Sequence, residues 1–198
     1  MLRDYAPLSF KLLQPDAAYA QPTQVIPERV SLEDPATTVM TDLRAVSAVI
    51  VLSGDRLDEA HRRMLQRAVR LLLVVDQNRR VVGVITAADI LGEKPMQVIG
   101  NRGIRREELL VRDVMTPQET LEVLDLDSVR AARVGHIVAT LRDLGRQHAV
   151  VVECDAEGRQ RVRGLFSATQ IARQLGVALP ATSEIALTFS QIEAQLAR

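Results

Sequence analysis

The sequence predicts an α/β protein built from two β-α-β-β-α repeats, with an extended N-terminal arm and a C-terminal amphipathic helix. Three observations predict this fold class. Five of the eight prolines lie within the first 35 residues. The segment GVITAADI at 83–90 returns as GLFSATQI at 164–171, an offset of 81 residues. Both segments follow apolar runs of strand length. The chain of 198 residues is long enough to bury one sizeable core or two small ones.

The arm is predicted over residues 1–35, because each proline fixes its own backbone angle and disfavours helix just before it. The first repeat is predicted over 36–93, beginning with a strand at 48–52. A helix follows whose apolar face comprises Leu57, Ala60, Met64, Leu65 and Ala68. The runs LLLVV at 71–75 and VVGVIT at 81–86 predict a hairpin, after which AADIL begins a second helix.

A connector is predicted over 94–108 and the second repeat over 109–177. In the second repeat, HAVVV and VRGLFS predict the hairpin. The helix before it has an apolar face of Val134, Ile137, Val138, Leu141 and Leu144. The last element, within 178–198, is a helix whose apolar stripe is Ile185, Phe189, Ile192 and Leu196. Its polar face is not strongly basic, so we expect it to pack on protein and not on a membrane.

Composition argues against several classes of function. Lys plus Arg and Asp plus Glu both number 25, and aromatic residues make up 3% with no Trp, so we expect no nucleic-acid binding. One cysteine excludes an internal disulfide, no apolar run approaches the ~18 residues of a membrane span, and the N-terminus lacks a signal peptide. We therefore expect a cytoplasmic protein. Neither HExxH nor a phosphate-binding loop is present, so we expect neither an enzyme nor a metal site.

Thr86 and Asp89 stand where the second hairpin strand turns into a helix, and two explanations fit them. A threonine with an acidic residue three positions later forms a capping box. A carboxylate at a helix start can also accept hydrogen bonds from both hydroxyls of a ribose. The two roles are compatible. In the second repeat Ser167 and Gln170 also fit a capping box, but the neutral amide of Gln170 is a poorer acceptor for two hydroxyls.

At these residues the chain resembles a tandem pair of cystathionine-β-synthase-type (CBS) domains, known as a Bateman module, over about residues 36–177. VMT at 39–41 and RDVMTP at 112–117 are similar to the segments that open such domains. LLVVD and AVVVE are similar to the first hairpin strand, and GVITAAD matches the ribose motif. The resemblance implies a regulatory module that requires no cofactor and binds AMP, ADP, ATP or S-adenosylmethionine between its domains. It also implies a homodimer that signals to an unidentified protein partner.

The resemblance further implies ligand-binding residues. Gly83, Thr86 and Asp89 belong to the ribose motif, with Ser167 and Gln170 at the matching positions of the second repeat. Arg70 and His148 precede or begin hairpin strands, where the family often places basic residues against phosphates; a solvated Arg and a structural His are the alternatives. Val49 and Ile50 would line the adenine pocket, although core packing explains them equally well. The rival function is a structural dimerisation module with unused clefts.

Overall fold

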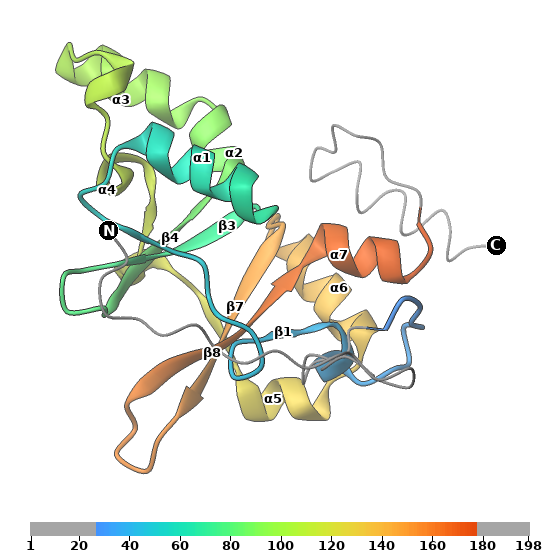
Figure 1. Cartoon of the computed structure of the whole chain (residues 1–198). Coiled ribbons are helices and arrows are strands. Elements are labelled where there is room, and N and C mark those ends of the chain that lie inside the picture. The colour runs from blue at the N-terminus through green and yellow to red at the C-terminus, as the bar shows by residue number, and fades with distance from the viewer. Residues whose placement is uncertain (1–26, 178–198) are drawn as a thin grey trace, which may run out of the picture.

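The computed structural model describes residues 27–177, which form two units, each with a sheet and its own helices (Figure 1). In spatial order the first sheet contains β2 (Ile50–Leu52), β3 (Leu71–Val75), β4 (Val81–Thr86) and β5 (Thr116–Pro117). The second contains β1 (Thr41–Asp42), β8 (Gln160–Ser167), β7 (His148–Cys154) and β6 (Val123–Asp125). The predicted α/β class with two repeats is confirmed.

Helices cover the outer face of each sheet. The first unit carries α1 (Leu57–Arg67), α2 (Ala87–Leu91), α3 (Lys94–Arg102) and α4 (Val111–Val114). The second carries α5 (Leu126–Ala131), α6 (Val134–Asp143) and α7 (Ala168–Gln174), and short 3₁₀ turns lie at η1 (Ala36–Val39), η2 (Arg106–Glu108) and η3 (Gln118–Thr120). Within residues 27–177, no helix is long and apolar enough to cross a membrane.

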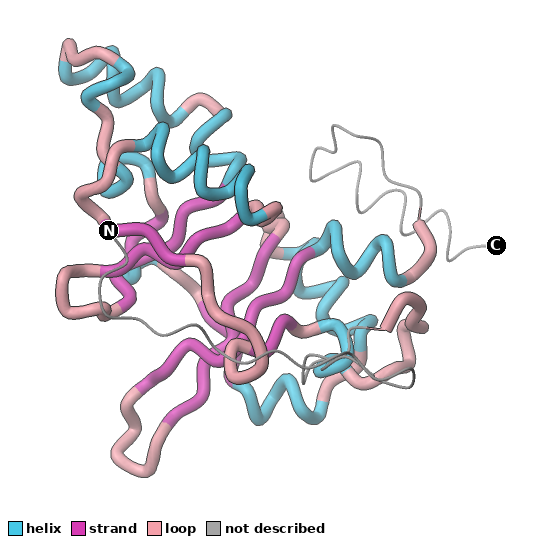
Figure 2. Tube along the Cα trace, in the orientation of Figure 1, coloured by secondary structure: helices cyan, strands magenta, loops and turns pink. Residues whose placement is uncertain are grey.

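Three apolar layers hold the units together, with helices outside and strands inside (Figure 2). One layer joins the first sheet to its helices through residues such as Leu72 and Ile85, and another joins the second sheet to its helices around Phe166. The middle layer lies between the two sheets and includes Leu73 and Val150. Because the sheets share this middle layer, the two units are parts of one folded body.

Each sheet takes its edge strand from the sequence that opens the other repeat. Thr41 of β1 pairs with Leu165 of β8, and the preceding turn η1 packs into the core of the second unit. In the same way, Pro117 of β5 pairs with Gly83 of β4, and α4 packs into the core of the first unit. The two units of the structure therefore differ from the sequence intervals 36–93 and 109–177. The opening segment VMT joins the second unit, and the opening segment RDVMTP joins the first.

Part of the predicted arm also belongs to the second unit. The Val30 N–H donates to the Gln174 carbonyl at 2.9 Å, and the Gly135 N–H donates to the Leu32 carbonyl at the same distance. Both Val30 and Leu32 pack against the core around Phe166. The rest of the arm, residues 1–26, and the predicted C-terminal helix within 178–198 lie outside the described residues.

The predicted apolar face of α1 is correct for Leu57, Ala60 and Met64, which are buried, and wrong for Leu65 and Ala68. Leu65 is 70% exposed because one residue turns the helix by about 100°, which carries it away from the stripe that Leu57, Ala60 and Met64 share. Ala68 is exposed and ends the helix in the left-handed conformation, at φ 52°. In α6, Leu144 is 41% exposed and stands just past the helix end.

The glycine of the ribose motif has a packing role. A Cβ on Gly83 would collide with the backbone carbonyl of Thr116 in β5, whereas the atoms nearest to a Cβ on its counterpart Gly164 belong to the side chain of Met40. Methionine is flexible and can move, but a paired strand cannot. We therefore expect Gly83→Ala to lower the free energy of unfolding by about 1–3 kcal/mol or more. Gly164→Ala should cost clearly less in the same urea titration; equal losses would contradict this account.

Candidate functional site

Asp89 caps α2 and stands at the junction between the units. Its Oδ2 accepts hydrogen bonds from the Thr86 N–H at 2.9 Å and from the Thr86 hydroxyl at 2.7 Å, while the Asp89 N–H donates to Thr86 Oγ1 at 3.2 Å. The predicted capping box is thus present. Its Oδ1 accepts from the ammonium of Lys94 at 2.5 Å, and the side chain of Asp89 is 11% exposed. Both carboxylate oxygens therefore have protein donors.

The second copy does not repeat this arrangement. Ser167 is the N-cap residue of α7, but its side chain makes no capping hydrogen bond, so the predicted capping box of Ser167 and Gln170 is wrong. The Gln170 amide nitrogen is buried without a hydrogen-bond partner. A neutral amide gains less than a carboxylate from the N–H groups at a helix start, which accounts for the difference. The two copies are not equivalent at this position.

Arg70 and His148 begin the hairpins of their units, although they are not structural counterparts. The Arg70 carbonyl accepts from the Ala87 N–H at 2.9 Å, and the Gln147 carbonyl accepts from the Ala168 N–H at 2.8 Å, so Arg70 corresponds to Gln147. His148 pairs with Ser167 as Leu71 pairs with Thr86, so His148 corresponds to Leu71. This register agrees with the sequence similarity of LLVVD at 72–76 and AVVVE at 149–153.

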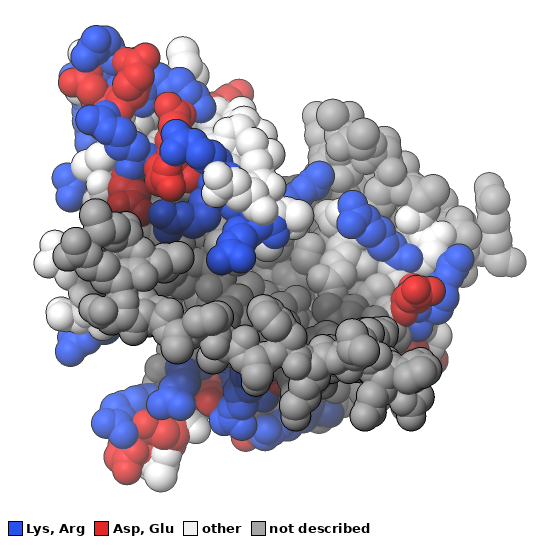
Figure 3. All heavy atoms as spheres, viewed as in Figure 1, with Lys and Arg blue, Asp and Glu red and all other residues white. Residues whose placement is uncertain are grey.

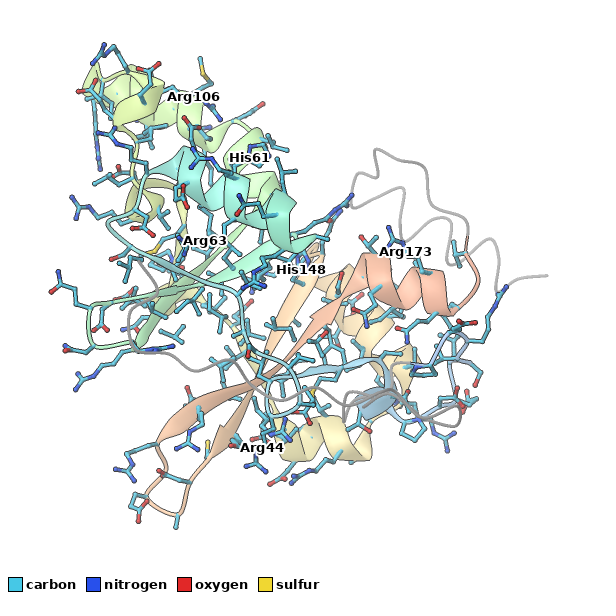
Figure 4. The ribbon with its side chains drawn as sticks, viewed as in Figure 1. Arg44, His61, Arg63, Arg106, His148 and Arg173 are labelled. Carbon is cyan, nitrogen blue, oxygen red and sulfur yellow. The ribbon has the colours of Figure 1, made fainter. Side chains whose placement is uncertain are left out.

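His148 lies between the two units (Figure 4) and is electrostatically coupled to residues of the first. Burial, which has the largest effect, and the guanidinium of Arg70 together lower its pKa from 6.5 to about 4, against the opposite influence of the Asp89 carboxylate. These influences require both first-unit side chains to lie near the imidazole. Arg70 and Asp89 lie at the same end of β3 and β4, and both act electrostatically on His148 of the other unit.

Val49 and Ile50 lie at the same end of the first sheet as Arg70 and Thr86. Ile50 is in register with Leu73 in the parallel pair of β2 and β3, and Leu71 is opposite Thr86. Val49 packs toward the helices and Ile50 toward the other sheet. Their packing in these two layers supports a role in the core. Gly83 also has a structural role, because β5 lies directly against its backbone.

Sequence reasoning did not identify two basic residues near these positions. Arg63 of α1 is about one-third exposed, donates to the Ile50 carbonyl at 2.7 Å and lies 3.4 Å from a carboxylate oxygen of Glu59 (Figure 4). Lys94 is the first residue of α3 and pairs with Asp89. The signal for Arg63 was its place four residues after Glu59 on a predicted helix. Lys94 lies in the predicted connector, where no motif drew attention to it.

A shallow hollow of about 180 Å³ lies at the far end of the second sheet, where β6 and β7 end. It is lined by Asp125, Leu126, Asp127, Arg130, Glu153 and Cys154. Asp125 caps α5 by accepting from the N–H groups of Asp127 and Ser128. None of the sequence-predicted site residues lies here. Among residues 27–177, no cluster of three or more His, Cys, Asp or Glu side chains is arranged to hold a metal ion.

Comparisons with known proteins agree with this architecture. Residues 27–95 match the family model described as the CBS domain. An uncharacterised conserved protein from Pyrococcus horikoshii shares the fold with a TM-score of 0.53 at 20% identity, over 77% of this chain and 100% of that one. No curated protein matches the chain.

Two further solved structures carry CBS domains. A conserved CBS-domain protein of unknown function from Thermoplasma acidophilum has a TM-score of 0.50 at 18% identity, covering 80% of this chain and 77% of that chain. A putative signal-transduction protein with CBS domains from Burkholderia ambifaria has a TM-score of 0.50 at 17% identity, covering 69% and 89%. The family match places a CBS domain at residues 27–95, and these solved structures share the duplicated fold of the chain.

Proposed function

We propose that the protein is a regulatory module that binds an adenosine-containing ligand at the junction between its two units and signals the bound state to a protein partner. The observation that carries the proposal is the position of Asp89 at the start of α2, at the same end of β3 and β4 as Arg70 and within electrostatic range of His148 in the other unit. A buried carboxylate at a helix start suits a ribose diol, and a guanidinium beside an imidazole suits a phosphate. The proposed role is binding in the cytoplasm, with no catalysis and no required cofactor.

Each remaining residue of the predicted site has a role in the proposal. Thr86 orients Asp89 through the capping box. Val49 and Ile50 would contact adenine from the end of β2, and Gly83 keeps β5 close to β4 so that the junction holds its shape. Ser167 and Gln170 would form a second, weaker cleft, because the Gln170 amide offers only one oxygen acceptor. AMP, ADP, ATP and S-adenosylmethionine are the candidate ligands.

A second candidate function is a structural dimerisation module with unused clefts. Leu65 of α1, Leu91 of α2 and Met96 of α3 are 65–70% exposed. They lie on helices that contact one another, and in Figure 3 uncharged surface adjoins the mixed positive and negative side chains of the first unit. A second copy of the chain could cover these apolar side chains. We propose that the regulatory module is a homodimer as well, so dimerisation alone does not separate the two functions.

A nucleotide panel separates the two functions. At a ligand concentration ~100 times Kd, binding adds roughly 2.7 kcal/mol of stability, so the melting temperature should rise by about 5–10 °C for a chain of this size. Thermal shift is measured with AMP, ADP, ATP and S-adenosylmethionine, and light scattering on the same samples gives the mass. No shift with any ligand at millimolar concentration favours the structural module, and a monomeric mass at micromolar concentration excludes the homodimer.

A further inference from the structure

The helix α3 is attached at both ends to carboxylates that cap neighbouring helices. At its first residue, the Lys94 ammonium binds Asp89 Oδ1 at 2.5 Å. At its last residue, Arg102 Nη1 binds Asp113 Oδ1 at 2.6 Å, and the other oxygen of Asp113 accepts from the Leu110 N–H at 2.9 Å, at the start of α4. Only one of these two similar ion pairs involves a residue of the proposed ligand site.

The hydrogen bonds of Asp89 leave too little capacity for a ribose. Each carboxylate oxygen accepts about two hydrogen bonds. Oδ2 already accepts from the N–H and the hydroxyl of Thr86, and both belong to the cap of α2. Oδ1 accepts from Lys94, so one acceptor position remains. A ribose with free 2′- and 3′-hydroxyls offers two donors, and both can bind Asp89 only after Lys94 leaves.

We propose that Lys94 is an internal competitor for the ribose site and thereby a specificity-determining residue. In the free protein Lys94 neutralises Asp89. A ligand with a complete ribose diol displaces it and breaks the ion pair between the first residue of α3 and Asp89, while a ligand with a single hydroxyl can bind beside it. This inference rests on the proposed function, because it assumes that Asp89 holds a ribose. The ion pair between α3 and the cap of α2 is then the contact that depends on the bound ligand.

The expected size of the effect is modest. The side chain of Lys94 is 50% exposed, and an ion pair of this kind is screened by solvent. Removing the competitor should therefore tighten AMP binding by roughly two- to fivefold. Lys94→Met keeps an unbranched side chain and removes the charge. Arg102→Met is the matched control, because it removes the same kind of ion pair from the other end of α3.

The test is calorimetry on the full-length protein with AMP and 2′-deoxy-AMP. We expect Lys94→Met to bind AMP more tightly while 2′-deoxy-AMP affinity changes less, so that the ratio of the two affinities rises two- to fivefold; in Arg102→Met the ratio should not change. Any non-specific effect of the lost positive charge on the phosphate acts on both ligands and cancels in the ratio. An unchanged or lower ratio in Lys94→Met overturns the inference while the proposed function stands. If neither AMP nor 2′-deoxy-AMP binds any of the three proteins, the inference is overturned for AMP, and the proposed function falls only if ADP, ATP and S-adenosylmethionine also fail to raise the melting temperature.

A second measurement reports directly on the lysine. The chain contains two lysines, Lys11 and Lys94, so mass spectrometry can follow acetylation of Lys94 against Lys11 as an internal reference. We expect saturating AMP to speed the acetylation of Lys94, because displacement from Asp89 frees its amine, and 2′-deoxy-AMP to do so less. Equal or slower labelling of Lys94 with AMP contradicts displacement.

Discussion

Replacing Asp89 by alanine should weaken the binding of an adenosine ligand by about ten- to a hundredfold or more. The substitution removes hydrogen bonds from ribose hydroxyls to a charged group, each worth roughly 1.5–3 kcal/mol. It also removes the cap of α2, so the free energy of unfolding should fall by about 0.5–2 kcal/mol. Calorimetry measures the first effect and urea denaturation the second.

Two controls separate binding from capping. Asp113 resembles Asp89 in accepting a backbone N–H at a helix start and in pairing with a basic residue of α3. Asp113→Ala should therefore lower stability and leave ligand affinity unchanged. Gln170→Ala should weaken binding far less than Asp89→Ala, since the site with the carboxylate is expected to carry most of the affinity. Equal affinities in the wild type, Asp89→Ala and Gln170→Ala would make Asp89 a cap and nothing more.

Lowering the pH from 7.5 to 4.5 should cost about 2–3 kcal/mol of stability through His148 alone. Its pKa is 6.5 in the unfolded chain and about 4 in the folded protein, because burial, with Arg70 acting in the same direction, disfavours the charged imidazole. The unfolded state therefore binds more protons between these values. The stability that comes from keeping His148 neutral is fully present above pH 6.5 and is lost as the pH falls toward 4.

The measurement is urea denaturation at both pH values for the wild type and His148→Leu. Leucine is the appropriate substitution because Leu71 occupies the corresponding position of the first unit. The variant should lose about 2–3 kcal/mol less than the wild type over the same interval. The comparison separates His148 from the other groups of the protein. Asp42 and Asp113, whose pKa values are held below 3.8 by hydrogen bonds and nearby arginines against the effect of burial, keep their contribution to stability down to pH 4.5. Equal losses in both proteins would show that His148 is not buried in its neutral form.

Local periodicity was enough to predict most of the fold. The apolar run at Leu71–Val75 and the following VVGVIT are β3 and β4, and the helical spacing after Leu57 is α1. Periodicity could not predict that β1 joins the second sheet and β5 the first. A strand of two residues carries no periodic signal, and nothing local in VMT shows which of two similar sheets it will join.

The candidate site was less predictable than the fold, for reasons that differ between residues. The capping box of Thr86 and Asp89 is present as the motif indicates, whereas that of Ser167 and Gln170 is absent. The motif shows which side chains are able to make capping hydrogen bonds, but not which of these hydrogen bonds form. His148 begins its hairpin strand as the run HAVVV predicts, but its place beside the first unit depends on how the two sheets pack, which no local pattern shows. Lys94 lies outside both repeats and reaches Asp89 only through the fold of the connector.

The exchange of edge strands also bears on how such a protein could arise from a shorter one. In a chain with only one copy of the repeat, the opening segment would find no second sheet in its own molecule and would have to pair with that of another chain. Each sheet would then gain its edge strand only at protein concentrations high enough for two chains to associate. Joining two copies in one polypeptide makes the pairing of Thr41 with Leu165 and of Pro117 with Gly83 intramolecular. Completion of both sheets then no longer depends on protein concentration.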